Sequence, residues 1–218
     1  MTSNTKLVIF DWDGTLFNSV GNIVLSLQYA AQHYQIPLDD ESAKSIIGLG
    51  LPEVMQTLFP HVPELHQGIL ERYAEHYVEN SQEDEWFEGV AEMLHQLKDH
   101  GFRLAVATGK SRRGLDRVLK KTQSEQLFEI TRAASETKSK PHPLMLQEIL
   151  AFTGLDAQQA IMVGDTSYDL EMAKNIAMPR IGVSYGVHAI DVLKQYHPVK
   201  IAHSVADLHQ SLLKINND

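Results

Sequence analysis

The chain of 218 residues contains no cysteine. It can therefore form neither a disulfide bond nor a metal site built on thiolates. No apolar run approaches the roughly 18 residues that cross a membrane, and the segment before the first apolar run lacks the hydrophobic region of a signal peptide. We therefore expect a cytoplasmic protein that has no membrane partner.

Positive charge is also scarce. Lys and Arg number 19 against 28 Asp and Glu, which gives a formal net charge of -9 and an isoelectric point near 5.6. A surface that binds the backbone of nucleic acid needs clustered Lys and Arg, so we expect no nucleic-acid partner. Hydrophobic residues make up 43% of the chain. This content and length predict one large globular domain, or one domain with a small insertion.

The most informative stretch is the apolar run 7–10, which ends abruptly in Asp-Trp-Asp-Gly-Thr at 11–15. The run predicts a strand buried on both faces. Side chains two apart on a strand point the same way, so we expect Asp11 and Asp13 to converge. At about 5 Å and an effective dielectric constant near 20, two carboxylates repel by about 3 kcal/mol. A nearby cation or a raised pKa must compensate for this repulsion.

Two structural alternatives exist for the same stretch. Asp-Gly is typical of hairpin turns, but no alternating strand follows Thr15 in the sequence. An EF-hand loop carries its glycine at the sixth position, whereas Gly14 stands at the fourth. On its own the stretch fits a functional site and a structural turn equally well. The residues elsewhere in the chain are needed to distinguish these two interpretations.

The hydrophobic period then becomes helical, and we interpret residues 18–82 as a small all-helical insertion. Asn18 or Ser19 is the expected N-cap of its first helix, and no segment in it alternates like a strand. Eight acidic residues against only Lys44 and Arg72 give this segment most of the net negative charge. The simplest interpretation is a solvated face, and repulsion of large polyanionic substrates is the alternative. Further helices are expected at 41–47, 51–58 and 64–79.

From Trp86 onwards, helical and strand-like segments alternate. This pattern predicts an α/β fold of the Rossmann-like kind, with a parallel sheet covered by helices on both faces. Ligands of such sheets lie beyond the carboxyl ends of the strands. Strands are expected at 102–107, 130–134, 160–163, 179–184 and 199–201, and helices at 89–100, 111–122, 143–153, 167–177, 189–194 and 204–215.

Four polar residues follow these strands or lie in the loops beyond them. Thr108 ends an apolar strand and, taken alone, fits a turn or an N-cap. Lys140 precedes a helix, where the helix dipole does not favour a cation. Asp165 ends a strand and Asp169 follows one helical turn later, and capping explains one of the two but not both. Carboxylates suit a hard cation, while a hydroxyl and an ammonium suit phosphate oxygens, so the set predicts a phosphoryl-transfer site.

The chain resembles the haloacid dehalogenase superfamily over nearly its whole length. That family carries a helical cap between its first and second motifs, and Gly-Val-Ser-Tyr-Gly at 182–186 resembles its phosphoglycolate phosphatase branch. The resemblance implies a catalytic core of residues 1–17 and 83–218 and a cap of residues 18–82. Asn18 departs from the pattern, because relatives commonly carry Asp there. The four motifs, in family order, are Asp11-x-Asp13-Gly14-Thr15, Thr108, Lys140-Pro141 and Gly164-Asp165-x-x-x-Asp169.

The same resemblance implies catalytic roles. Asp11 would be the nucleophile that forms an aspartyl-phosphate, and Asp13 would act as general acid and base. Thr108 and Lys140 would hold the phosphoryl oxygens. The expected Mg²⁺ site consists of Asp11, the backbone carbonyl of Asp13, and Asp165, with Asp169 orienting a water ligand or Lys140.

The substrate is expected to touch both parts of the chain. The glycine loop at 48–50 is the candidate for substrate specificity, and a simple helix break is its structural alternative. The full set of expected substrate contacts is Trp12, through its backbone N–H, Thr15, Gly109, Lys110, Gly48, Leu49 and Gly50.

These features predict a Mg²⁺-dependent phosphatase for a small phosphomonoester, either phosphoglycolate-like or a sugar phosphate, that acts as a monomer or homodimer. A sugar-phosphate mutase of the same branch is the main alternative. A response-regulator receiver is another, but such domains lack a helical insertion and an acidic pair after the lysine. Dehalogenases of the superfamily need neither metal nor the second aspartate, so Asp13 and Asp165 favour phosphoryl transfer.

Overall fold

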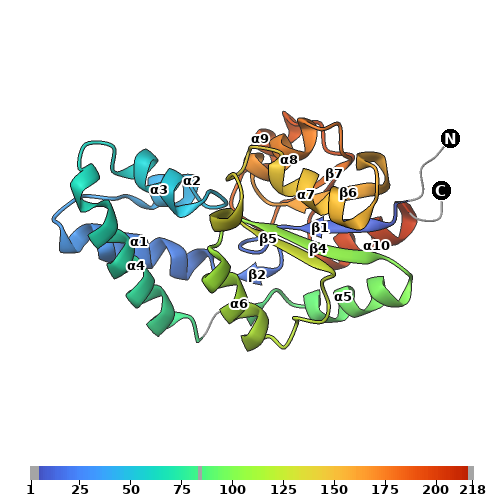
Figure 1. Cartoon of the computed structure of the whole chain (residues 1–218), viewed down its shortest axis with the longest axis horizontal. Coiled ribbons are helices and arrows are strands. Elements are labelled where there is room, and N and C mark those ends of the chain that lie inside the picture. Colours follow the sequence, from blue (N-terminus) through green and yellow to red (C-terminus); the bar gives the residue numbers. More distant parts are fainter. Residues whose placement is uncertain (1–4, 83–84, 216–218) are drawn as a thin grey trace.

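The computed structural model describes residues 5–82 and 85–215. A parallel sheet of six strands lies at its centre, in the order β5-β4-β1-β6-β7-β8 (Figure 1). This arrangement confirms the predicted α/β fold class. The strands are β1 (Leu7–Phe10), β4 (Arg103–Thr108), β5 (Ile130–Ala133), β6 (Ala160–Gly164), β7 (Arg180–Val183) and β8 (Lys200–Ala202).

Helices cover both faces of the sheet, and the side chains of β1, which point alternately to the two faces, contact both helical layers. Val8 and Phe10 pack against α5, α6 and α10, whereas Leu7 and Ile9 pack against α7 and α8, and all four side chains are fully buried. In Figure 1 the two helical layers lie below and above the strands. The helices are α5 (Val90–Asp99), α6 (Arg112–Lys121), α7 (Leu144–Thr153), α8 (Ser167–Lys174), α9 (Ile190–Lys194) and α10 (Val205–Ile215), with short 3-10 helices η2 (Ala134–Glu136) and η3 (Ala157–Gln159).

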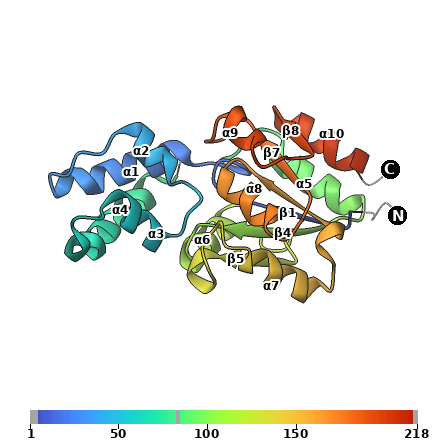
Figure 2. The ribbon, with the colours of Figure 1, turned by 90° about the horizontal axis from the view of Figure 1, so that it is seen from above.

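The segment 18–82 forms a helical unit at one end of the sheet (Figure 2). Its apolar side chains make a cluster of their own, with Leu27, Met55 and Ile69 among the buried members. Within the described residues, no helix of the chain is long and apolar enough to cross a membrane. The helices of the unit are α1 (Val20–His33), α2 (Asp40–Ser45), α3 (Leu51–Leu58), η1 (Pro63–Leu65) and α4 (His66–Asn80).

No hairpin follows Thr15, but a short strand that the sequence pattern does not predict does. The short strand β2 (Phe17–Asn18) pairs antiparallel with β3 (Glu85–Trp86), so the chain enters and leaves the helical unit through a two-stranded ribbon. The partner strand lies far along the sequence, and therefore no local alternation reveals it. The expected domain boundary at residue 83 lies outside the described residues.

The helix that falls furthest short of its expected length is α8. Helix α8 ends at Lys174, before the expected end at Ala177. Ala177 has a φ of 54°, in the left-handed region, and helical backbone cannot continue through it. The chain therefore leaves the helix early and turns back towards β7.

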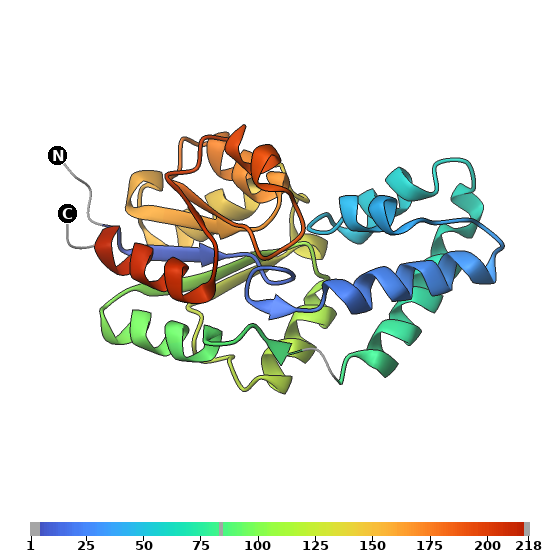
Figure 3. The ribbon, with the colours of Figure 1, turned by 180° about the vertical axis from the view of Figure 1, so that it is seen from behind.

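The topology places β1 between β4 and β6. The order of the strands reverses at β1, and such a switch point is where open parallel sheets bind ligands. Phe10, the last residue of β1, pairs with Val106 on one side and Val163 on the other. Figure 3 shows the arrow of β1 pointing towards the helical unit. The residues that follow β1, β4 and β6 therefore meet at the edge of the sheet that this unit faces.

Candidate active site

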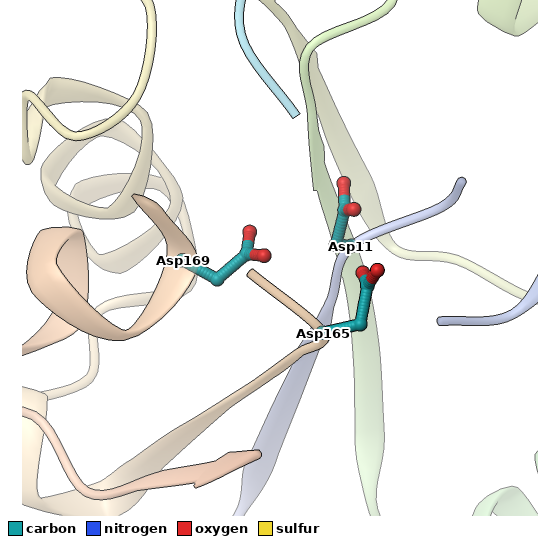
Figure 4. Close-up of side chains that lie close together, drawn as sticks. All are labelled: Asp11, Asp165 and Asp169. Atoms are coloured by element: carbon teal, nitrogen blue, oxygen red, sulfur yellow. The ribbon is translucent and has the colours of Figure 1, made fainter. Parts of the chain in front are cut away.

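Three carboxylates gather at this edge of the sheet. One oxygen each from Asp11, Asp165 and Asp169 lies within 4.8 Å of the others, and all three side chains are buried. Figure 4 shows them converging from β1, the end of β6 and α8. Oδ2 of Asp11 is buried without a hydrogen-bond partner among the described residues. Buried carboxylate oxygens, one of them without a partner, fit a hard cation such as Mg²⁺.

Lys140 bonds two of these carboxylates. Its Nζ lies 2.6 Å from Oδ1 of Asp11 and 2.6 Å from Oδ1 of Asp169. Burial lowers the pKa of Lys140, but Asp11 and Asp169 outweigh this effect and raise it above its ordinary value. Burial also raises the pKa of Asp11 well above its usual range, although Lys140 opposes the shift. One ammonium does not balance three buried carboxylates, so the site favours an additional cation.

Asp165 is held by two donors. Its Oδ1 accepts a hydrogen bond from the hydroxyl of Thr15 at 2.8 Å, and its Oδ2 accepts one from the backbone N–H of Val187 at 2.8 Å. Burial and the nearby Asp169 raise the pKa of Asp165 to about 7. A Cβ atom at Gly14 or Gly186 would collide with its carboxylate, so both positions require glycine.

Asp169 has a structural task in addition to its bond to Lys140. Its Oδ2 accepts hydrogen bonds from the backbone N–H of Thr166 at 3.1 Å and from the hydroxyl of Thr166 at 2.7 Å. The two residues form the capping box that begins α8. Both oxygens of Asp169 therefore have donors, which suits the expected role of orienting Lys140.

Asp13 does not join the carboxylate group, and the expected convergence of Asp11 and Asp13 is not found. Oδ1 of Asp13 instead accepts a hydrogen bond from the hydroxyl of Ser19 and lies 2.8 Å from Nζ of Lys110. Nζ of Lys110 also donates to the hydroxyl of Tyr77 on α4 at 3.2 Å. The two aspartates thus pair with different lysines, and each lysine offsets part of the charge of its partner.

A cavity of about 550 Å³ opens beside Asp13, between the helical unit and the sheet. The loop 48–50 meets the core at Gly109, where a Cβ atom would lie 2.6 Å from the backbone oxygen of Leu49. The backbone N–H of Gly50 donates to the hydroxyl of Ser139 at 2.7 Å. The cavity is therefore closed on one side by contact between this loop and the core.

The sequence model of the haloacid dehalogenase-like hydrolases matches residues 8–183. The chain belongs to this family. It is 33% identical to "Probable phosphatase IndB" of Dickeya dadantii, with 97% of this chain and 96% of that protein covered. It is also 31% identical to a phosphoglycolate phosphatase of Mannheimia succiniciproducens, with 95% and 98% covered. A protein of Clostridium acetobutylicum described as a predicted phosphatase has the same fold, with a TM-score of 0.87, 27% identity, and 97% of this chain and 100% of that chain covered.

Family membership makes the protein a hydrolase and removes the receiver-domain alternative.

Of the family motifs, Thr108 is fully buried at the end of β4, and its hydroxyl accepts a hydrogen bond from the backbone N–H of Lys110 at 3.2 Å. The ring of Trp12 lies in the core rather than at the cavity. This position leaves unchanged the expectation that Trp12 contacts the substrate through its backbone N–H. The hydroxyl of Thr15 donates to Asp165, and Thr15 is not among the described residues that line the cavity, where a substrate contact was expected.

The sequence did not predict several residues that contact the site residues or line the cavity of this haloacid dehalogenase-like hydrolase. Ser19 was expected only as a helix cap, yet its hydroxyl bonds Asp13. Tyr73 and Tyr77 lie on α4 four residues apart, a spacing that is equally typical of core residues. Ser139 reaches the glycine loop only through the tertiary fold. No sequence motif marks these four positions.

The raised pKa of Asp165 predicts how stability depends on pH. Between the usual value of 3.8 and about 7, the folded protein holds a proton that the unfolded chain has released. The free energy of unfolding of the metal-free protein should therefore fall as pH rises through this window. We expect its melting temperature to drop on the order of 5 °C between pH 5 and pH 8 in chelator, and much less in excess Mg²⁺. Asp165→Asn should reduce the drop, and an unchanged drop in that variant would contradict the assignment.

Proposed function

We propose that the protein is a Mg²⁺-dependent phosphatase that hydrolyses a small phosphomonoester through an aspartyl-phosphate on Asp11. The observation that carries this proposal is the different surroundings of the two motif aspartates. Asp11 lies in the buried carboxylate group beside Lys140, whereas Asp13 lies at the edge of the cavity beside Lys110. A nucleophile and an acid–base group need such different surroundings. The names of the relatives, which include phosphoglycolate phosphatase and pyrophosphatase, support small phosphate compounds as substrates.

In the first step, the carboxylate of Asp11 attacks phosphorus and the bond from phosphorus to the ester oxygen breaks. Lys140 holds the Asp11 carboxylate in place and, with Thr108, donates to the phosphoryl oxygens as charge develops on them. Asp11, the backbone carbonyl of Asp13, and Asp165 would hold Mg²⁺, which when bound acts as a Lewis acid that neutralises phosphoryl charge.

Asp13 then serves both steps. It gives a proton to the departing alcohol, and it afterwards takes a proton from the water that attacks the aspartyl-phosphate. Ser19 and Lys110 fix the position of its carboxylate. Selection of the leaving alcohol then falls to the cavity beside Asp13.

We further propose that residues 18–82 act as a cap that closes over the site, on a core formed by 1–17 and 83–218. Three contacts support a closed arrangement: Gly50 N–H to Ser139, the hydroxyl of Tyr168 to the backbone oxygen of Ser45 at 2.7 Å, and Lys110 to Tyr77. Closure of this kind excludes bulk water and limits the size of the substrate.

The proposed metal site predicts strict dependence on Mg²⁺. Hydrolysis of p-nitrophenyl phosphate should stop in excess chelator and return when Mg²⁺ is restored. Ca²⁺ should inhibit, because its larger and looser coordination shell does not hold an in-line arrangement. Phosphate release is the measurement, and it should need no bisphosphate primer, which separates a phosphatase from a mutase. Full activity in chelator would contradict the proposal.

The two aspartates should fail in different ways when each is changed to asparagine. Asp11→Asn removes the nucleophile, so no substrate should yield a covalent intermediate. Asp13→Asn should slow alkyl phosphates by about 10²- to 10⁴-fold, because a poor leaving group needs its proton. With p-nitrophenyl phosphate, which leaves unprotonated, this variant should give a burst of p-nitrophenol and a phosphoryl group that mass spectrometry locates on Asp11. Turnover of alkyl phosphates by Asp13→Asn at the parental rate would remove Asp13 from its proposed role.

Cap closure can be tested at the glycine loop. Ser139→Ala removes the acceptor for the backbone N–H of Gly50. Amide exchange in a peptide covering 46–52 should become roughly two- to tenfold faster, the effect of losing one hydrogen bond. Ser135→Ala is the matched control, because that hydroxyl accepts from the backbone N–H of Arg112 within the core. Equal exchange in the two variants would show that the loop does not dock as proposed.

A further inference from the structure

One wall of the cavity is apolar. Aliphatic side chains from α1, α3 and the loop after α2 line it, among them Ile23, Leu27, Ile47 and Val54. Each of these four is at most 7% exposed. These four side chains offer no polar group to bind the hydroxyls or the charge of a leaving alcohol.

Two tyrosines of α4 form another wall. Tyr73 and Tyr77 line the cavity with their ring centroids 5.8 Å apart. The hydroxyl of Tyr77 accepts from Lys110, whereas the hydroxyl of Tyr73 forms no hydrogen bond within the described part of the chain. This wall therefore offers aromatic surface and one phenol group to whatever binds there.

The charges around the cavity do not favour a second anion. Neither Lys44 nor Arg72, the two cations of the segment 18–82, is among the described lining residues. The ionised groups that the cap does contribute are three exposed glutamates on α4, Glu71, Glu75 and Glu79.

The cations that line the cavity come from the core, and two of the three already have partners. Nζ of Lys110 lies 2.8 Å from Oδ1 of Asp13. The guanidinium of Arg117 lies 5.4 Å from the ring centroid of Tyr77. Arg113 is exposed. Among the described lining residues, Arg113 is thus the one cation with no ion pair or ring contact, and the other cations are already engaged by Asp13 or Tyr77.

We infer that the leaving group of the substrate is an uncharged, largely apolar alcohol, larger than glycolate, that packs against the aliphatic and aromatic walls of this cavity. This inference rests on the proposed phosphatase activity and narrows it. A carboxylate or second phosphate buried against these side chains would lose its hydration without a partner. The volume of about 550 Å³ lies within the range of pockets that enclose ligands much larger than glycolate.

A series of phosphate esters tests the inference. Ethyl, butyl, hexyl and benzyl phosphate differ in apolar size, while phosphoglycolate and glucose 6-phosphate supply a charged and a hydroxylated leaving group. We expect kcat/KM to rise roughly two- to fourfold per added methylene until the cavity is filled. Benzyl phosphate should exceed phosphoglycolate at least about tenfold, given the cost of burying an unpaired charge. A flat series, or a preference for phosphoglycolate or glucose 6-phosphate, would overturn the inference.

A pair of variants tests whether the cavity wall sets this preference among leaving groups. Leu49 is a partly buried lining residue of the glycine loop, and Leu49→Lys places a cation at the cavity wall. This change should raise the ratio of phosphoglycolate to butyl phosphate kcat/KM at least about fivefold, the effect of supplying a charge partner. Leu25→Lys is the control, because Leu25 is on α1 but 61% exposed and outside the cavity. Equal ratios in the two variants would place the specificity elsewhere.

Binding without turnover separates this inference from the proposed function. Butylphosphonate and 3-phosphonopropionate are non-hydrolysable mimics of an apolar and a carboxylated ester, and calorimetry in Mg²⁺ gives their affinities. Tighter binding of butylphosphonate, by about tenfold or more, supports the apolar subsite even if no ester is hydrolysed. Equal or reversed affinities overturn it, even if phosphate is released. An absence of phosphate release from every ester, including p-nitrophenyl phosphate, would instead overturn the proposed activity.

Discussion

The burial of Asp11, Asp165 and Asp169 around a single ammonium is the constraint on which the rest of the site depends. Carboxylates removed from water repel one another and lose hydration, so the fold has to supply compensating interactions. Lys140 bonds two of them, Thr15 and the backbone of Val187 bond the third, and glycines make room for it. The remaining negative charge creates the affinity for a cation that a phosphoryl-transfer site requires.

The stability for this arrangement comes from the sheet. Strand β1 is buried on both faces, and its neighbours β4 and β6 pair with it along its whole length. A side chain that follows such a strand has little freedom to move away from its neighbours. The aromatic cluster of Trp12, Phe17 and Trp86 packs beneath the turn after β1, with the rings of Trp12 and Trp86 centred 5.0 Å apart. The turn that carries Asp11 and Asp13 is therefore held by hydrophobic packing together with its own backbone hydrogen bonds, such as those from the N–H groups of Leu16 and Phe17 to the carbonyl of Trp12.

Most of the fold follows from local sequence patterns, and so do the positions of the buried site residues Asp11, Lys140 and Asp165. Hydrophobic periodicity gives the six sheet strands and the main helices, and the order of the polar strand ends brings Asp11, Lys140 and Asp165 together. The ribbon of β2 and β3 could not be predicted, because its two strands are short and far apart in sequence. The same reason hides Ser19 and Tyr77, whose roles arise only when the inserted helices pack over the sheet.

The cap uses the same side chains for folding and for shaping the cavity. Ile23, Leu27 and Val54 belong to its hydrophobic cluster and also line the cavity. A polar substitution at one of them would place an unpaired polar group in the cluster that holds the helices together, so it would cost stability as well as changing the site. Leu49 is only partly buried and lies in the loop that touches Gly109, so it can change with less effect on the cluster. If the loop selects the substrate as proposed, this selection can vary with less effect on folding than a change elsewhere in the helical unit.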